Sequence, residues 1–255
     1  SHTGGYTPFS FDITPALSAK GVQKLTVKVT DSTDKGFQPH GKQVLEPHGI
    51  WYTPVTGIWQ TVWIEPVPAA NRIEGITTRS DIRAGVLSVD VKTARTGSDR
   101  VCVTLSADGK TLAERSSMAG QPVHLAVEHP RLWSPDDPYL YDLTVTLLRD
   151  GRVIDRAESY AALREIATGR DANGIERMTL NGRPLFHFGP LDQGWWPDGL
   201  YTAPTDEALL YDIRFTKQLG FNMIRKHIKV EPERWYWHCD REGILVWQDL
   251  SPIHI

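Results

Sequence analysis

The sequence predicts a multidomain fold in which antiparallel β structure precedes a parallel α/β unit, and two patterns in the 255 residues support this prediction. Up to about residue 167, apolar and polar residues alternate in short runs separated by Gly- and Pro-containing turns, as in half-buried strands. After residue 168, strand-like apolar runs alternate with helix-like runs, which is typical of parallel strands joined by helices. A chain of this length is expected to form two or three domains.

Residues 1–68 are predicted to be antiparallel β structure. The run Leu25–Thr30 alternates apolar and polar residues, and a loop rich in Gly and Pro follows from Asp34 to Gly49. A turn at Pro54–Gly57 leads into a last aromatic strand, after which prolines mark a linker.

Residues 69–167 show a more regular alternation, for example in Leu87–Lys92, with turn signals such as Arg149–Arg152 between the runs. A segment of about 100 residues with this pattern fits an immunoglobulin-like β-sandwich. His124 and His129 stand alone in it, so we expect surface histidines there and no ligand site.

Residues 168–255 begin with a hairpin around an Asn-Gly turn at residues 181–184 and continue into a loop at residues 190–201. The loop holds more aromatic and carboxylate side chains than a connection needs, and loops at strand ends commonly carry sites. The candidate residues in it are Asp192, Trp195 and Trp196. A helix is then predicted from about Thr205, its N-cap, to Gly220.

The segment Phe221–Leu250 is predicted to be a strand–helix–strand unit, with Pro232 in the first helical turn and Gly243 just past the helix end. The strands of such a unit run parallel, and ligands collect at their carboxyl ends. The polar residues at those ends are Arg225, His227 and Asp249.

Arg225 and His227 are two residues apart and therefore project to the same face of their strand. Two interpretations stay open for them. In an architectural one, Arg225 pairs with Asp249 and His227 caps a loop. In a functional one, the three residues contact a ligand.

Composition excludes some partners. The charge of −3 comes from interspersed residues without a basic run, which argues against nucleic acid or an anionic membrane, and no stretch approaches a membrane span. Cys102 and Cys239 are interpreted as packing residues, not as a disulfide or a metal pair. The nine tryptophans suit sugar stacking as well as core packing.

Two segments, Thr56–Glu65 and Phe221–Leu250, closely resemble the signatures of glycoside hydrolase family 2, which includes β-galactosidases, β-glucuronidases and β-mannosidases. Further matches, in the same order along the chain, are Leu132–Pro135, Pro138–Tyr141, Leu180–Leu185 and Cys239–Gly243. The resemblance implies a retaining glycosidase. It also implies that residues 1–68 are the C-terminal part of a jelly-roll sugar-binding domain and that residues 168–255 are the N-terminal part of a (β/α)8 TIM barrel.

The family's two catalytic glutamates follow the fourth and seventh barrel strands, and retention requires their carboxyl groups to be ~5–5.5 Å apart. This chain reaches the third strand and contains no Asn-Glu dipeptide, so no catalytic residue is assigned in it, and we expect it to be inactive alone. The incomplete barrel is expected to leave an apolar interior face lined by residues such as Ile224 and Val246.

Two departures from the family pattern concern the substrate side. Gly189–Trp196 stands where members usually have an Asn-Arg-His segment, and His227 follows Arg225 by two residues instead of three. The resemblance therefore implies no particular sugar.

The resemblance implies a carbohydrate substrate and no cofactor or metal, and the complete enzyme could be a homo-oligomer. The expected substrate-binding residues are Asp192, Trp195, Trp196, Arg225, His227 and Asp249. The alternatives are a carbohydrate-binding module without activity and a purely structural protein of sandwich domains.

Overall fold

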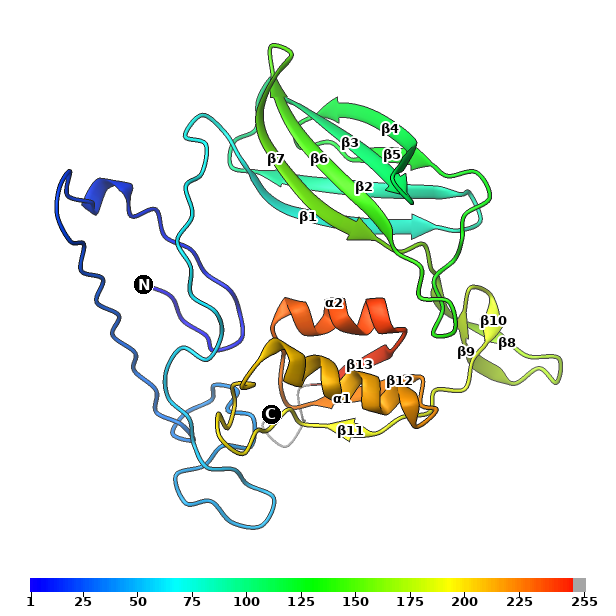
Figure 1. Cartoon of the computed structure of the whole chain (residues 1–255). Helices are drawn as coiled ribbons and strands as arrows, with labels where there is room; N and C mark the ends of the chain where they lie inside the picture. Colours follow the sequence, from blue (N-terminus) through cyan, green and yellow to red (C-terminus); the bar gives the residue numbers. More distant parts are fainter. Residues whose placement is uncertain (250–255) are drawn as a thin grey trace.

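The computed structural model describes residues 1–249, which form an extended N-terminal segment, a β-sandwich and an α/β unit (Figure 1). Leu250, the predicted end of the last strand, lies with residues 251–255 outside the described residues. Within residues 1–249, no helix has the length and apolar character needed to cross a membrane.

The β-sandwich consists of two antiparallel sheets, as the alternation predicted. One sheet has the order β1-β2-β5, with β1 at Ile73–Asp81, β2 at Val86–Thr93 and β5 at Val123–Ala126. The other has the order β4-β3-β6-β7, with β3 at Arg100–Ala107, β4 at Lys110–Met118, β6 at Tyr141–Arg149 and β7 at Arg152–Ala161.

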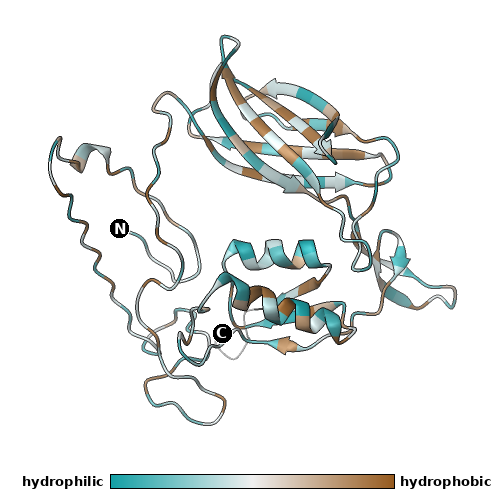
Figure 2. Cartoon of the chain, viewed as in Figure 1, coloured by the Kyte–Doolittle hydropathy of each residue, from teal (hydrophilic) through white to brown (hydrophobic). Residues whose placement is uncertain are grey.

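The sandwich core forms because every second residue of a strand points inward. Figure 2 shows the resulting bands of apolar and polar residues along these strands. The inward residues include Leu87, Val89, Val101, Val103, Leu105, Leu125, Leu143, Val145 and Leu147. The hairpin β6–β7 turns through Asp150 and Gly151, with φ values of 50° and 75°, as a tight hairpin turn requires.

A small antiparallel sheet of order β10-β9-β8 connects the sandwich to the α/β unit. Its strands are β8 at Ile166–Arg170, β9 at Glu176–Leu180 and β10 at Arg183–Pro184. The predicted Asn-Gly turn joins β9 to β10.

The α/β unit has three parallel strands in the order β11-β12-β13. They are β11 at Leu191–Asp192, β12 at Met223–His227 and β13 at Leu245–Asp249, and the helices are α1 at Asp206–Gln218 and α2 at Glu233–Glu242. The Thr205 side chain caps α1 by accepting from the Ala208 N–H at 3.1 Å, and Gly243 ends α2 in the left-handed conformation.

The helices cover one face of the parallel sheet (Figure 1), and Ile224 packs there against Leu209, Ile213 and Trp235. The expectation that Ile224 and Val246 line a bare interior face is therefore wrong. Alternation along β12 and β13 directs both residues toward α1 and α2. The uncovered face carries Arg225, His227 and Asp249 at its carboxyl end, and Met223 and Leu245, which pack with Trp133, at its amino end.

The first 68 residues do not form the expected antiparallel strands. They contain one short 3-10 turn, Thr14–Ala16, and an isolated bridge between Gln43 and Tyr52. A strand needs a neighbouring strand for its ladder of hydrogen bonds. The alternating run near Leu25 is extended but has no such neighbour, and the Leu25 side chain is 63% exposed.

Trp133 joins the sandwich to the α/β unit. Its side chain is 0% exposed and packs with Met223 and Leu245, while its Nε1–H donates to the Asp240 carbonyl at 2.6 Å. Arg164 stacks over the indole at 4.4 Å and pairs with the Asp240 carboxylate at 2.6 Å. The sandwich thus holds the C-terminal end of α2 in place.

Candidate functional site

A polar group of three residues lies at the carboxyl ends of β12 and β13. Arg225 Nε donates to Asp249 Oδ2 and His227 Nδ1 donates to Asp249 Oδ1, each at 2.6 Å. The parallel register places His227 opposite Asp249, and alternation places Arg225 on the same face. This confirms the shared face of Arg225 and His227, and it confirms the pairing of Arg225 with Asp249 that the architectural interpretation predicts.

The group holds its carboxylate ionised. Burial alone would raise the pKa of Asp249, but the hydrogen bonds from Arg225 and His227 together outweigh it and bring that pKa below its ordinary value. Because His227 uses Nδ1 for Asp249, its Nε2, which has no hydrogen-bond partner among residues 1–249, is the nitrogen that could bind a ligand. The Arg225 side chain is 44% exposed, so its terminal N–H groups can reach a bound molecule.

Trp247 and His187 lie beside this group on the uncovered face. Trp247 pairs in register with Arg225, and its Nε1–H donates to His187 Nδ1 at 2.8 Å. Burial lowers the pKa of His187, which favours the neutral ring that accepts this bond. His187 is not among the site residues predicted from sequence, although its position between two phenylalanines was an available signal.

The structure does not bring Asp192 to the Arg225 group. Asp192 Oδ2 instead accepts from Lys226 Nζ at 2.6 Å, and Asp192 Oδ1 accepts from the Gly194 N–H at 2.7 Å. Lys226 lies on the helix-covered face, over the ring of Trp235 at 4.4 Å. Asp192 is therefore separated by the sheet from Arg225.

Trp195 and Trp196 take different positions in the loop after β11. Trp195 stacks on Tyr52 of the N-terminal segment, with ring centroids 4.4 Å apart, and the Tyr52 hydroxyl donates to Gln193. Trp196 packs toward the core under the helices, and its buried Nε1 has no hydrogen-bond partner among the described residues. Trp195 and Tyr52 together form an aromatic surface on the loop, to which Trp196 does not contribute.

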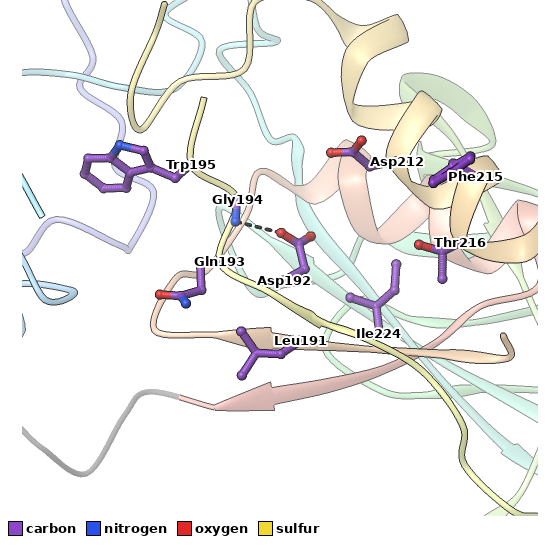
Figure 3. Close-up of a pocket in the computed structure, with 9 residues that line it drawn as sticks. All are labelled: Leu191, Asp192, Gln193, Gly194, Trp195, Asp212, Phe215, Thr216 and Ile224. Carbon is purple, nitrogen blue, oxygen red and sulfur yellow. Dashed lines mark hydrogen bonds between the residues drawn. The ribbon is translucent and has the colours of Figure 1, made fainter. Parts of the chain in front are cut away.

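A pocket of about 360 Å³ opens between this loop and α1 (Figure 3). Its lining residues are Leu191, Asp192, Gln193, Gly194, Trp195, Asp212, Phe215, Thr216 and Ile224. Burial, and then the nearby Asp192 charge, raise the pKa of Asp212. The pocket lies on the helix side of the sheet, so it is separate from the Arg225 group.

Among residues 1–249, no cluster of His, Cys, Asp or Glu could hold a metal ion. Cys102 and Cys239 are free thiols, and Cys239 packs in the core under the helices, as the sequence predicted.

Comparisons with known proteins agree on one family. The sequence profile of glycosyl hydrolases family 2 matches residues 71–164. A beta-galactosidase of Bacteroides ovatus is 29% identical over 95% of this chain and 28% of its own length, and one of Thermoanaerobacter pseudethanolicus is 24% identical over 98% and 34%. This chain thus spans about a quarter to a third of the length of these curated relatives.

Solved structures give the same picture. A family 2 glycosyl hydrolase from Bacteroides cellulosilyticus superposes with a TM-score of 0.59 at 25% identity, covering 69% of this chain and 26% of that one. The beta-glucuronidase of Ruminococcus gnavus, solved with D-glucuronic acid, gives a TM-score of 0.63 at 21% identity. The match covers 72% of this chain and 31% of the glucuronidase. The second similarity supports the fold alone.

Proposed function

Because the chain belongs to family 2 of the glycosyl hydrolases, we propose that it forms part of a retaining β-glycosidase and supplies one wall of its substrate pocket. The observation that carries this proposal is the Arg225–Asp249–His227 group at the ends of two parallel strands. Binding residues of barrel enzymes gather at such ends.

In the proposed enzyme, the parallel strands β11 to β13 and their two helices are the first part of a (β/α)8 TIM barrel. The preceding sandwich corresponds to the family's immunoglobulin-like domain, and residues 1–68 belong to its jelly-roll domain. The uncovered face with Arg225 and His227 then faces the barrel interior.

The proposed role of the Arg225 group is to orient the sugar. Hydrolysis with retention uses two carboxyl groups ~5–5.5 Å apart, one as nucleophile and one as acid and base, and neither is assigned in this chain. The ionised Asp249 fixes Arg225 and His227. The remaining N–H groups of Arg225 donate to sugar hydroxyls or to a reacting carboxylate, and His227 Nε2 accepts from a sugar hydroxyl. Correct orientation of this kind contributes about 10²-fold to the rate.

The substrate class proposed is a β-linked glycoside. The relatives are named beta-galactosidases and beta-glucuronidases, so both sugars belong in a substrate panel. Trp247, beside Arg225, is the aromatic candidate for contact with a sugar ring at the Arg225 group. Trp195, in the loop at the carboxyl end of β11, is the candidate at the rim of the substrate pocket.

The test is hydrolysis of nitrophenyl β-glycosides by the complete product of the gene that contains this chain. We expect turnover with retention of configuration, and no turnover by residues 1–255 alone. Binding of glycosides without hydrolysis by the complete product would favour the carbohydrate-binding alternative. Hydrolysis by residues 1–255 that one Asp or Glu substitution abolishes would show that this chain itself contains a catalytic carboxylate, contrary to the proposal.

A further inference from the structure

Four charged side chains, three of them buried and one 25% exposed, form a cluster beneath the loop that follows β11, and the Arg225 group does not include them. They are Asp192, Lys226, Lys229 and Glu231. Lys226 is 1% exposed, Lys229 is 0% exposed and Glu231 is 4% exposed. Such residues are rarely buried unless they are paired, and here two ammonium groups balance two carboxylates.

Lys229 fastens both ends of the loop. Its Nζ donates to the Gly194 carbonyl at 2.7 Å and to the Tyr201 carbonyl at 2.8 Å, and it lies 3.2 Å from Glu231 Oε1. An ammonium group has three donors, and these three acceptors use all of them. The ring of Tyr201 lies 4.6 Å from the same Nζ and adds a cation–π contact.

Lys226 and Asp192 fasten the start of the loop. Lys226 Nζ donates to Asp192 at 2.6 Å and to Glu231 at 2.9 Å, while the other Asp192 oxygen accepts from the Gly194 N–H. Gly194 has φ +62°, and a Cβ there would lie 2.2 Å from Glu231 Oε1. The backbone therefore touches the charges so closely that only glycine fits.

The loop in turn presents the aromatic surface. Between its two anchored ends lies Trp195, which stacks on Tyr52. The Trp196 N–H donates to the Leu200 carbonyl at 2.7 Å, and the Leu200 N–H donates back at 3.0 Å. A shift of the loop would move Trp195 together with this backbone pair.

We propose that Lys229, together with Lys226, Asp192 and Glu231, is a positioning residue for the substrate pocket, acting through the loop from Gly194 to Tyr201. This inference rests on the proposed glycosidase function for its kinetic consequence, and on the contacts above for its structural one. Removing the Lys229 ammonium leaves two buried carbonyls without a donor and Glu231 with one cation, which is costly in a desolvated site. The loop then adopts other positions, and Trp195 no longer holds one place.

The structural test is hydrogen exchange in the Lys229→Met variant of the complete protein, read at the Trp196 and Leu200 amides. Methionine keeps an unbranched apolar stem up to Cε but lacks the ammonium group and its donors. We expect exchange in this loop to become 10- to 100-fold faster, with unchanged protection in β3 and β6.

The matched control is Lys217→Met. Lys217 is half-buried, whereas Lys229 is fully buried, but it likewise donates to two backbone carbonyls, those of Pro135 and Gly243, and it lies away from the loop. We expect loop exchange in this variant to match that of the wild type. Equal loop exchange in the wild type and in Lys229→Met would overturn the proposal, and so would equal effects of the two substitutions.

The kinetic test uses the same variants on nitrophenyl β-glycosides. We expect kcat/KM to fall 10- to 100-fold in Lys229→Met and to stay unchanged in Lys217→Met. If Lys229→Met does not fold, Asp192→Asn, which keeps an acceptor for the Gly194 N–H, should give a smaller loop-specific effect, and its absence would contradict the proposal. An inactive wild type would refute the glycosidase function. The hydrogen-exchange rates of the loop amides would still show whether the charged cluster holds the loop in place.

Discussion

The substitution Trp133→Phe tests how the sandwich holds the α/β unit. Asp240 lies in the last turn of α2, where carbonyls lack helical donors, and the Ile244 N–H bonds to the Cys239 carbonyl instead. The Trp133 Nε1–H supplies the hydrogen bond to the Asp240 carbonyl. Phenylalanine keeps an aromatic ring in the site but removes this donor.

The expected cost has two parts. Leaving a buried carbonyl unsatisfied costs about 1–3 kcal/mol. The smaller phenylalanine ring loses roughly 40 Å² of buried apolar contact, which costs about 1 kcal/mol at ~25 cal/mol per Å². Because Trp133 is 0% exposed, water does not replace either contribution. The α/β unit should therefore lose about 2–4 kcal/mol of local stability, which corresponds to roughly 30- to 1,000-fold faster amide exchange at ~1.4 kcal/mol per decade.

Hydrogen exchange of Trp133→Phe should show this increase in α2, β12 and β13, with the β3 and β6 amides little changed, because the sandwich buries a core of its own. Trp237→Phe is the control. It makes the same Trp-to-Phe change at a half-buried position within α2 itself, away from the Asp240 carbonyl contact. Faster exchange of equal size in the sandwich, or equal effects of the two variants, would refute the assigned role of Trp133.

Two further predictions concern stability. Hydrogen bonds from Arg149 and then Asn71 lower the pKa of Asp99 to about 2, so this carboxylate stabilises the fold above the ordinary value of 3.8 and ceases to do so as the pH falls to about 2. In urea unfolding, Asp99→Asn should have a lower free energy of unfolding than the wild type, and this difference should shrink as the pH falls from 3.8 to about 2. A difference that stays constant over this range would contradict the stabilising role of the ionised Asp99. Gly194→Ala should lose about 1–3 kcal/mol in thermal unfolding, because its Cβ would lie 2.2 Å from Glu231, and unchanged melting would show that the loop is not confined.

Patterns confined to a single strand or helix were predictable from sequence. The alternation of Leu87, Val89 and Val91 determines which residues face the sandwich core, and the Thr205 cap and the Gly243 stop act within their own helix. The strands expected near Leu25 depend on partners elsewhere in sequence, which alternation alone does not provide.

The candidate site divides in the same way. Arg225 and His227 share a face because they are two residues apart, and the parallel register then brings Asp249 to both. The position of Asp192 depends on Lys226 and on the path of the loop across the sheet edge. Its ion pair is a tertiary contact between residues 34 apart, and periodicity carries no information about such contacts.

The proposal that the Arg225 group orients the sugar is tested by kcat/KM of Arg225→Met in the complete protein on nitrophenyl β-glycosides. The free energy of unfolding of the same variant is measured alongside. The half-exposed pair between Arg225 and Asp249 should contribute less than about 1 kcal/mol to folding, whereas misplacing the sugar should lower kcat/KM by about 10²-fold. Wild-type turnover combined with a clear loss of stability would show that the Arg225 group is architectural and would contradict the account.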